Sequence, residues 1–533
     1  MKMTKHLTLE LTKKEFASEK WPSFLEKKLT IPSMKAFSRF FVKEKTFVCF
    51  GSWLCYDSKL KLNEFMKLVK NRKWSDLNLV SADFLIIFAR LSEKKIFILT
   101  SQSGAFPCYF SASKERLLLS TDFAWIKNKL KTKRLDRDWM LDYLSLCVLL
   151  TERTVLEEIK QLPPATLLTI DENFNFEYKS TVDIPQILSN IGQRYVSREK
   201  YANDFIEVLK TIISERLKKI NAFPFGCDLS SGLDVNLVAY ILKEYFDYPF
   251  KCFSRISKAS PEDTDWQIVE KFSEKHDLKV EYINADDYFP FSQQHELDWI
   301  AENFYPADHG EELQFQLLSK AGANKCFFEF NGDGGDEIYK FQEVKKQEKF
   351  ALQHEYFWAI RSVKGGINEI ITEKGKNLIL SAERFQKKVY FPSLMPRSAV
   401  QINLLFFPIM IETGVRQIAP FNDPKMVRFS LLIPEKTTKW NLWKHRGDIF
   451  LPEQFKPKGH FQAHIDLFLT EKLDFVIQTL ENSVLKRTKI VDIEKILKDL
   501  KIKNLDPYQN KPAAVLDNVI RLEYFLQKNS VTV

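Results

Sequence analysis

The chain has 533 residues, and this length favours two or more domains over a single core. Hydrophobic residues make up 45% of the sequence and charged residues 28%, which is ordinary for a globular protein and excludes disorder as the default state. The net charge of +9 is a small excess for this length, and no nucleic-acid-binding module is recognisable, so we expect no nucleic-acid partner.

Short strands dominate the first part of the chain. Alternating apolar residues and intervening turn residues predict one strand in residues 46–57 and four more in residues 83–122, which we interpret as a β-meander. The basic stretch KNKLKTKR, Lys127 to Arg134, favours a solvated surface, with a docking patch for an acidic peptide or nucleic acid as the alternative. Helical spacing follows in residues 137–150, and residues 165–179 resemble a closing hairpin.

The second part of the chain has a different rhythm. After an amphipathic helix in residues 201–220, predicted strands alternate with predicted helices. The strands are residues 223–229, 249–254, 279–284 and 325–330, and the helices are residues 234–246, 262–276 and 311–322. This alternation predicts a parallel, doubly wound sheet, followed from about Tyr339 by a mostly helical region. We place the two domains at residues 1–195 and 196–533.

The cysteines and apolar stretches indicate the compartment. None of the seven cysteines forms a CxxC pair, which suits a reducing environment without disulfides or structural zinc. The first residues lack the apolar core of a signal peptide, and the longest apolar stretch, residues 402–411, is too short to span a bilayer. We therefore expect a cytoplasmic protein without a membrane span.

A polar loop, LSSGLDV, follows the first predicted strand of the parallel sheet, where open sheets of this kind bind ligands. Ser230 and Ser231 offer hydroxyls, Gly232 allows close approach to the backbone, and the following helix presents free N–H groups to an anion. Asp234 would repel phosphate directly, so we expect it to hold Mg²⁺ that bridges phosphates.

A second loop, NGDGGDEIY, follows the strand at residues 325–330. Metal-phosphate binding explains why glycines and carboxylates share this short loop. A glycine-bearing turn is also a structural solution in its own right, so neither loop is decisive alone. Together, in this order on one sheet, they predict a nucleotide site, and the absence of GxxxxGK[ST] excludes a Walker-type NTPase.

These loops carry a resemblance to a known family. LSSGLD resembles the pyrophosphatase loop SGGLDS of asparagine synthetase-like enzymes, and NGDGGDEIY is similar to their second signature, SGEGADELFGGY. Residues 101–126, 153–170, 419–440 and 451–461 resemble further family segments in the correct order. The resemblance implies an α+β and α/β protein. An Ntn-hydrolase-like β-rich domain would be followed by a doubly wound ATP-pyrophosphatase (synthetase) domain with a helical carboxyl-terminal part.

Enzymes of this family activate a carboxylate with ATP, release pyrophosphate and let an amine attack the acyl-adenylate. The resemblance implies ATP and Mg²⁺ as cofactors, with Asp234 and Asp336 as metal ligands. It implies that Lys458 neutralises charge on the adenylate and that Asp333 helps to deprotonate the amine. The implied ATP- and pyrophosphate-binding residues are Leu229, Ser230, Ser231, Gly232, Leu233, Asp234, Asn236, Cys252, Phe253, Ser254 and Gly332.

The sequence also departs from the family pattern. Lys2 stands where glutamine-dependent members have their nucleophilic cysteine, so we expect no glutaminase activity in the first domain. Val235 replaces a phosphate-loop serine, with Asn236 as the nearest substitute, and Pro457 replaces a common basic residue. These changes leave open a non-catalytic scaffold that binds nucleotide or peptide.

Two branches of the family lack the cysteine nucleophile, namely the β-lactam synthetases and the lasso-peptide cyclases. The sequence looks more similar to the cyclases in three places. It has IYKFQ in place of FGGY, RQIAPF where EaR is expected before PF, and the terminal segment AAVLDNVIRLEYFLQKNS. This implies cyclisation of a ribosomal precursor peptide between its amino terminus and an Asp or Glu side chain, with a leader protease or leader-binding protein as a further partner. The alternative is an asparagine synthetase-like or β-lactam-synthetase-like ligase that joins a small carboxylate to ammonia or an internal amine.

The segment KWNLWKHR contains further candidates. We expect Trp440 and Trp443 to pack into the core, with the basic residues at the surface, and the alternative is contact with pyrophosphate or peptide. We expect His445 and His460 to be structural or surface residues, because neither has a partner at ligand spacing.

Overall fold

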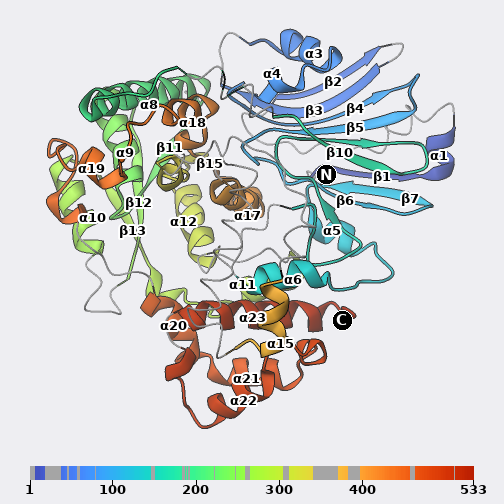
Figure 1. Cartoon of the computed structure of the whole chain (residues 1–533). Helices are drawn as coiled ribbons and strands as arrows, with labels where there is room; N and C mark the ends of the chain where they lie inside the picture. Colours follow the sequence, from blue (N-terminus) through green and yellow to red (C-terminus); the bar gives the residue numbers. More distant parts are fainter. Residues whose placement is uncertain are drawn as a thin grey trace.

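The protein is described by a computed structural model. It covers residues 6–18, 38–44, 47–56, 60–78, 80–145, 151–182, 187, 189, 192–220, 223–246, 248–257, 265–303, 311–339, 370–381, 397–455, 462–508 and 511–533. Figure 1 shows a β-rich part, a second part in which helices surround a parallel sheet, and a helical carboxyl-terminal part at the bottom of the view. This arrangement confirms the fold class that the sequence predicts.

The β-rich part contains two antiparallel sheets. The larger has the order β10-β9-β5-β4-β3-β2, and the smaller has the order β1-β7-β6-β8. The strands are β1 Thr8–Thr12, β2 Ser38–Glu44, β3 Phe47–Cys55, β4 Ala82–Arg90, β5 Lys95–Thr100, β6 Tyr109–Ala112, β7 Arg116–Ser120, β8 Lys160–Gln161, β9 Thr166–Ile170 and β10 Phe176–Ser180. A short helix, α1 (Lys13–Ala17), follows β1.

The two sheets pack face to face, with helices on their outer surfaces. Phe110 of β6 meets Phe176 of β10 across the inner core, with ring centroids 5.1 Å apart. The outer face of the larger sheet is covered by α3 (Leu62–Lys70) and α4 (Trp74–Asn78), where Phe65 packs on Phe84. The outer face of the smaller sheet packs on α5 (Phe123–Lys127). The result is the four-layer, Ntn-type arrangement that the resemblance implies.

The strands in residues 83–122 do not form a single meander, so this prediction was wrong. β4 and β5 pair in the larger sheet, whereas β6 and β7 pair in the smaller one. The connecting residues 101–108, with Gly104 at φ 65°, carry the chain from one sheet to the other. Apolar alternation is the same in both arrangements, because either one buries one face of each strand.

The second part is built on a five-stranded parallel sheet with the order β13-β12-β11-β14-β15. The strands are β11 Phe225–Leu229, β12 Lys251–Ile256, β13 Val280–Asn284, β14 Phe328–Phe330 and β15 Arg416–Ile418. One face packs on α8 (Arg198–Ile220), α9 (Leu233–Tyr245) and α10 (Asp265–Lys275). The other packs on α12 (Glu311–Ala323) and α17 (Arg397–Thr413). The sheet is therefore doubly wound, as predicted.

The strand order fixes where a ligand can bind. The chain leaves β11 toward β12 on one side and reaches β14 on the other side of β11. Such a reversal opens a crevice at the carboxyl ends of the two adjacent strands. The two polar loops follow β11 and β14, so the fold brings them to the same crevice.

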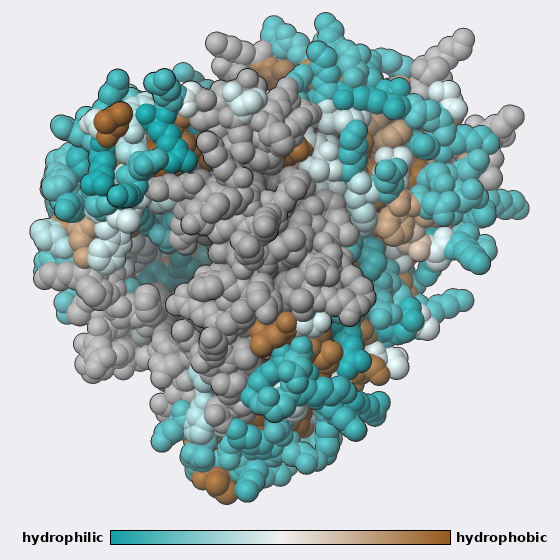
Figure 2. Space-filling view, in the orientation of Figure 1, coloured by the Kyte–Doolittle hydropathy of each residue, from teal (hydrophilic) through white to brown (hydrophobic). Residues whose placement is uncertain are grey.

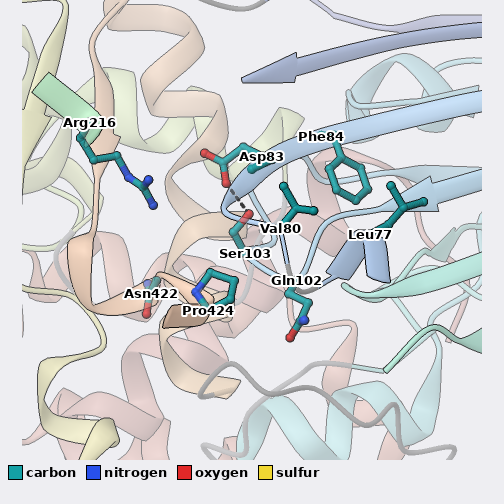
Figure 3. A pocket seen from close by; sticks show the side chains of 10 residues that line it. Leu77, Val80, Asp83, Phe84, Gln102, Ser103, Arg216, Asn422 and Pro424 are labelled. Atoms are coloured by element: carbon teal, nitrogen blue, oxygen red, sulfur yellow. Dashed lines mark hydrogen bonds between the residues drawn. The ribbon is translucent and has the colours of Figure 1, made fainter. Parts of the chain in front are cut away.

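Charged pairs join the β-rich part to the parallel-sheet part. Arg216 of α8 donates to Asp423 at 2.6 Å and to Ser81 at 2.9 Å, and all three side chains are buried. Arg416 of β15 pairs with Asp83 of β4 at 3.1 Å. Figure 3 shows the small cavity of about 20 Å³ beside these contacts, which has room for a water-sized occupant.

The carboxyl-terminal helices pack against both other parts. The longest of them, α23 (Lys511–Lys528), contacts α6 (Arg137–Leu144) and α11 (Gln294–Glu302). The other helices of this part are α15 Glu373–Ile379, α20 Gln462–Glu471, α21 Leu473–Glu481 and α22 Ile493–Lys501. In contrast, α18 (Pro424–Ser430) and α19 (Lys439–Trp443) lie beside α8 in the parallel-sheet part (Figure 1). Among the described residues, no helix is both long enough and apolar enough to cross a bilayer.

The basic stretch at Lys127 to Arg134 lies mostly at the surface, as predicted, and Lys127 is its buried residue. Lys127 is buried, donates to the carbonyl of Ala301 at 2.8 Å and lies over the ring of Phe525. Burial lowers its pKa to about 8. Lys129 and Arg134 pair with nearby glutamates. The prediction of a solvated surface is therefore wrong for Lys127, whose charge helps to hold α23 in place.

Candidate functional site

The first loop connects the carboxyl end of β11 to the start of α9. Gly232 is the N-cap residue of α9, and no side chain caps the helix there. Ser230 accepts a hydrogen bond from the Gly232 amide at 3.0 Å. An uncapped helix start offers N–H groups and a positive dipole end to an anion. The loop therefore has the local geometry of a phosphate cradle.

The second loop lies against the first one. A Cβ on Gly332 would come within 2.6 Å of the Val235 amide nitrogen, and a Cβ on Gly335 would overlap the Asp234 carboxyl carbon. Gly334 has a φ of 89°, which favours glycine. Two of the glycines are thus explained by contact between the loops and one by backbone conformation.

The carboxylates of Asp234 and Asp336 converge on one ammonium group. Lys439, the first residue of α19, forms ion pairs with Asp234 and, at 2.7 Å, with Asp336. Burial acts to lower the pKa of Lys439, but the two carboxylates outweigh it and raise that pKa above its ordinary value. The three groups thus form one charged cluster where the loops meet. The sequence analysis includes Lys439 only as one of the basic residues of KWNLWKHR, which are expected at the surface, with contact to pyrophosphate or peptide as the alternative.

Buried aromatic residues hold one end of α19 against the core. Trp443 is buried, as predicted, and its indole N–H donates to the Tyr339 hydroxyl at 2.8 Å. Trp440 is 47% exposed, so the prediction that it packs into the core was wrong. Trp443 packs on Phe205 and Phe450 in the core of the parallel-sheet part, whereas Trp440, in the first turn of this five-residue helix, stays outside that core. His445 is exposed, in agreement with the prediction of a structural or surface residue.

A later segment of the chain also contacts the first loop. Gln454 is buried and donates to the Ser231 carbonyl oxygen at 3.3 Å. Its side-chain oxygen accepts from the Leu451 amide at 2.9 Å, which orients the amide group. Lys458, His460 and Pro457 lie outside the described residues, so their predicted roles stay predictions.

Most of the other predicted nucleotide-binding residues are buried. The side chains of Leu229, Leu233 and Cys252 lie in the core between the sheet and α9. Phe253 lies in the core on the opposite face, beside α12. In this conformation, the side chains of these four residues therefore cannot contact a nucleotide. Only their backbone atoms remain to line a pocket.

Two further predicted residues are buried polar groups. Ser254 and Asn236 are fully buried, and neither the Ser254 hydroxyl nor the Asn236 amide has a hydrogen-bond partner among the described residues. Buried polar groups normally find a partner, so their polar atoms are available to a ligand or a water. Asp333 is positioned by Asn331, whose side-chain amide donates to its carboxylate at 2.7 Å.

Sequence reasoning missed a buried polar cluster beneath the two loops. Asp228 of β11 accepts from Arg255 of β12 at 3.0 Å, and Arg255 donates to Gln314 of α12 at 3.0 Å. Glu329 of β14 accepts from Gln417 of β15 at 3.3 Å. Burial, and next the Asp228 carboxylate, raise the pKa of Glu329 well above its ordinary value. Burial also raises the pKa of Asp228, against the opposing effect of Arg255.

The residues of the two loops fit a magnesium ion that is shared with phosphates. No group of three or more metal-ligating side chains occurs among the described residues, so protein atoms alone do not complete a metal site there. Asp234 and Asp336 already meet at a single cation, the Lys439 ammonium. Mg²⁺ characteristically takes one or two carboxylates and fills its remaining positions with phosphate oxygens and water.

Comparison with known proteins agrees with this site. Residues 205–402 match the model of the asparagine synthase family. The match includes both loops and confirms the asparagine synthetase-like character of that segment. No curated protein matches the chain in sequence.

Two solved structures have weak similarity to the chain. One is glutamine phosphoribosylpyrophosphate amidotransferase from B. subtilis complexed with ADP and GMP, with 6% identity, 46% of this chain and 47% of that chain covered, and a TM-score of 0.19. The other is an allosteric regulatory enzyme of purine biosynthesis, with 7% identity, 40% and 46% covered, and a TM-score of 0.19. The chain spans just under half the length of both, and no functional argument rests on them.

Proposed function

We propose that the protein is an ATP- and Mg²⁺-dependent ligase that forms an amide bond through an acyl-adenylate. The observation that carries the proposal is the convergence of Asp234 and Asp336, one from each loop, on Lys439 at the switch point of the parallel sheet. The asparagine synthase match over residues 205–402 supports it, because the matched segment contains both loops.

In this proposal the first loop binds the phosphates of ATP. The Ser230 and Ser231 hydroxyls and the first amides of α9 donate to phosphate oxygens. Asp234 and Asp336 would hold Mg²⁺, which would supply positive charge to those oxygens. The Lys439 ammonium, displaced from the carboxylates, then pairs with phosphate, so the positive charge near the leaving pyrophosphate is kept.

The second half of the reaction is amine attack on the acyl-adenylate. Asp333, oriented by Asn331, accepts the proton that the attacking amine loses as its nitrogen bonds to the acyl carbon. The bond from that carbon to the AMP oxygen breaks, and AMP leaves with its electron pair. Lys458 stabilises the negative charge that develops in this step.

The substrate in this proposal is a ribosomal peptide, cyclised between its amino terminus and an Asp or Glu side chain. The support for this finer assignment is the resemblance of the sequence to lasso-peptide cyclases. A leader protease or leader-binding protein would then supply the free amino terminus. A small carboxylate joined to ammonia or an internal amine is the competing substrate class.

Product analysis tests the proposal. The protein is incubated with ATP, Mg²⁺ and either a candidate precursor peptide or aspartate with ammonium, and pyrophosphate, AMP and product masses are measured. Pyrophosphate with a peptide lighter by one water supports cyclisation, whereas pyrophosphate with asparagine supports the small-carboxylate reaction. If no partner gives pyrophosphate and no nucleotide binds, the protein is a non-catalytic scaffold and the proposal fails.

Variants of the site supply the matched comparison. Asp234→Asn and Asp336→Asn are expected to lower pyrophosphate release by at least about a hundredfold, because each removes a charge that holds Mg²⁺. His445→Ala is the control, since His445 lies nearby but is exposed. Equal turnover of the aspartate variants and the control would show that the metal site is elsewhere.

A further inference from the structure

A groove of about 810 Å³ lies between α8 on one side and Cys55, Tyr56 and residues 60–62 on the other. We call it the α8 groove. Figure 1 shows α8 and α3 at the top of the molecule, one from the parallel-sheet part and one from the β-rich part. The groove therefore runs along the junction of the two parts, and its lining includes no residue of the two nucleotide loops.

One wall of the groove is a single face of α8. Glu207, Lys210, Thr211, Ser214 and Lys218 line it, and these positions recur every three or four residues along three turns. The twelve helical residues from Glu207 to Lys218 span about 16 Å between their first and last Cα atoms. An extended peptide advances about 3.3 Å per residue, so the wall matches a segment of about five residues.

The opposite wall and the end of the groove are apolar. Leu60 and Leu62 are half-buried and pack against the core beneath α3. Phe246, also half-buried, packs against the core of the parallel-sheet part. These side chains present apolar surface to an occupant without being mobile themselves, because each is anchored in a core.

The charge of the lining is positive. The lining contains four lysines and two glutamates, and Lys210 pairs with Glu207 on α8 at 2.8 Å. Glu215 is already neutralised by Lys425, which lies outside the lining, with contacts of 2.6 and 2.7 Å. Lys61, Lys218 and Lys219 are exposed, and in the described part of the chain none of them has an ion pair. An occupant with negative charge therefore gains favourable interactions that the protein itself leaves unused.

We propose that the α8 groove binds an extended peptide segment that carries both acidic and aliphatic side chains. Its acidic side chains meet Lys61, Lys218 and Lys219, and its aliphatic side chains pack on Leu60, Leu62 and Phe246. The apolar side chains of the lining offer no partner to the continuous phosphate backbone of a nucleic acid, whereas such a peptide uses both the charged and the apolar surface. The proposal is independent of the ATP chemistry, because the groove contains none of the residues assigned to it.

Fluorescence anisotropy of labelled octapeptides tests this proposal. An alternating Glu-Leu peptide is titrated at about 50 mM salt, with alternating Lys-Leu and Ser-Leu peptides and an eight-nucleotide oligothymidine for comparison. The Glu-Leu peptide is expected to bind saturably and at least about tenfold more tightly than the other three. A Lys-Leu peptide or oligonucleotide that binds equally well would overturn the proposal, as would the absence of Glu-Leu binding.

Two kinds of variant locate the binding. Lys218→Glu with Lys219→Glu is expected to weaken Glu-Leu binding at least about tenfold. The control Lys279→Glu with Lys498→Glu makes the same charge change at exposed lysines outside the groove and is expected to leave binding unchanged. Ser214→Trp fills the groove without changing charge and is expected to abolish binding.

Melting temperatures show whether each variant remains folded. Equal binding by both double variants would overturn the proposal, because the attraction would then be general rather than local. Sedimentation analysis tests whether a second copy of the chain occupies the groove. If the wild type self-associates and the Lys218→Glu, Lys219→Glu variant is monomeric, the groove holds a second copy of the chain and the peptide assignment fails.

Discussion

Lys439 is the residue on which the electrostatics of the site depend. Its ammonium group lies between Asp234 and Asp336, which come from loops about a hundred residues apart. Without a cation at that point, two carboxylates would repel each other in a partly buried position. Lys439 therefore keeps the two loops together before any metal or nucleotide binds, and it competes with a metal for the same oxygens.

Replacement of Lys439 by methionine separates these two effects. Mn²⁺ binding to the nucleotide-free protein, measured by electron paramagnetic resonance, is expected to become several-fold tighter because the competing ammonium is gone. Pyrophosphate release is expected to fall at least about tenfold because a phosphate-neutralising charge is lost. Weaker Mn²⁺ binding in Lys439→Met would contradict the competition. Lys444→Met, at an exposed neighbour, is the control.

The close contact of Gly335 with Asp234 leads to a second prediction at this scale. A Cβ at residue 335 overlaps the Asp234 carboxyl group, so Gly335→Ala is expected to displace that carboxylate and to destabilise the fold by about 1–3 kcal/mol. Gly447→Ala is the control, because a Cβ there meets nothing within 4 Å, and its effect is expected to stay within about 0.5 kcal/mol. Urea unfolding measures both, and pyrophosphate release shows whether the site is lost.

Among the elements, β11 and β14 are unusual because each carries a buried carboxyl group near its carboxyl end. Asp228 and Glu329 point to the same face of the sheet, since Glu329 is in register with Gly226, two residues before Asp228. Asp228 Oδ1 and Glu329 Oε1 have no hydrogen-bond partner among the described residues. A proton held by Glu329 would remove one of the two buried negative charges and leave Asp228 ionised beside Arg255.

This pair predicts a pH dependence of stability. The pKa of Glu329 is raised in the folded state, so the folded protein keeps a proton that the unfolded chain releases near the ordinary glutamate pKa. The stabilisation by this group is complete below that ordinary value and is lost as pH rises toward the raised one. The urea midpoint is therefore expected to fall as pH rises above the ordinary glutamate pKa, and Glu329→Gln should have a shallower slope.

The control for that slope is Glu281→Gln. Glu281 lies on β13 of the same sheet, and its pKa is lowered because hydrogen bonds from Lys251 and Asn324 outweigh the effect of burial. Its contribution to stability is therefore lost on acidification, in the opposite direction to Glu329. If the urea midpoint of Glu329→Gln changed with pH as steeply as that of the wild type, Glu329 would not be the group that keeps a proton in the folded protein.

For the molecule as a whole, α23 holds the parts together through a buried charge. Arg521 contacts Asp517 on its own helix, Glu296 of α11 and Glu311 of α12, with every one of these side chains buried. Burial raises the pKa of Glu296 to about 7, although Arg521 opposes this. Asn518 of the same helix donates to the Tyr143 carbonyl of α6, which ties the cluster to the β-rich part.

Arg521→Met is expected to destabilise the protein by about 3–5 kcal/mol, because it leaves buried carboxylates without their counter-charge. The loss should be larger at pH 8 than at pH 5.5, since Glu296 takes up a proton below its raised pKa and no longer needs the arginine. Lys528→Met, at the accessible end of α23, is the control. Equal losses at both pH values would exclude Glu296 as the titrating group.

The sequence by itself determined the features that depend on neighbouring residues. Strand and helix alternation from α8 to β14, the closing hairpin of β9 and β10, and both glycine loops are local patterns, and the structure has them where they were predicted. Several elements escaped prediction, among them β1, β2, α3, α4, α11 and β15. β1 lies in the first residues of the chain, α11 precedes α12, and β15 has only three residues, too few for a periodic pattern.

Only the tertiary structure decided which distant groups meet. Apolar alternation cannot tell one meander from two stacked sheets, since both bury one face of every strand. Lys439 and Gln454 reach the first loop from more than two hundred residues away, and a sequence pattern contains no information about such a contact. The buried charges of Asp228, Glu329 and Arg521 depend on partners from other elements, because an unpaired charge in a core would be too costly to retain.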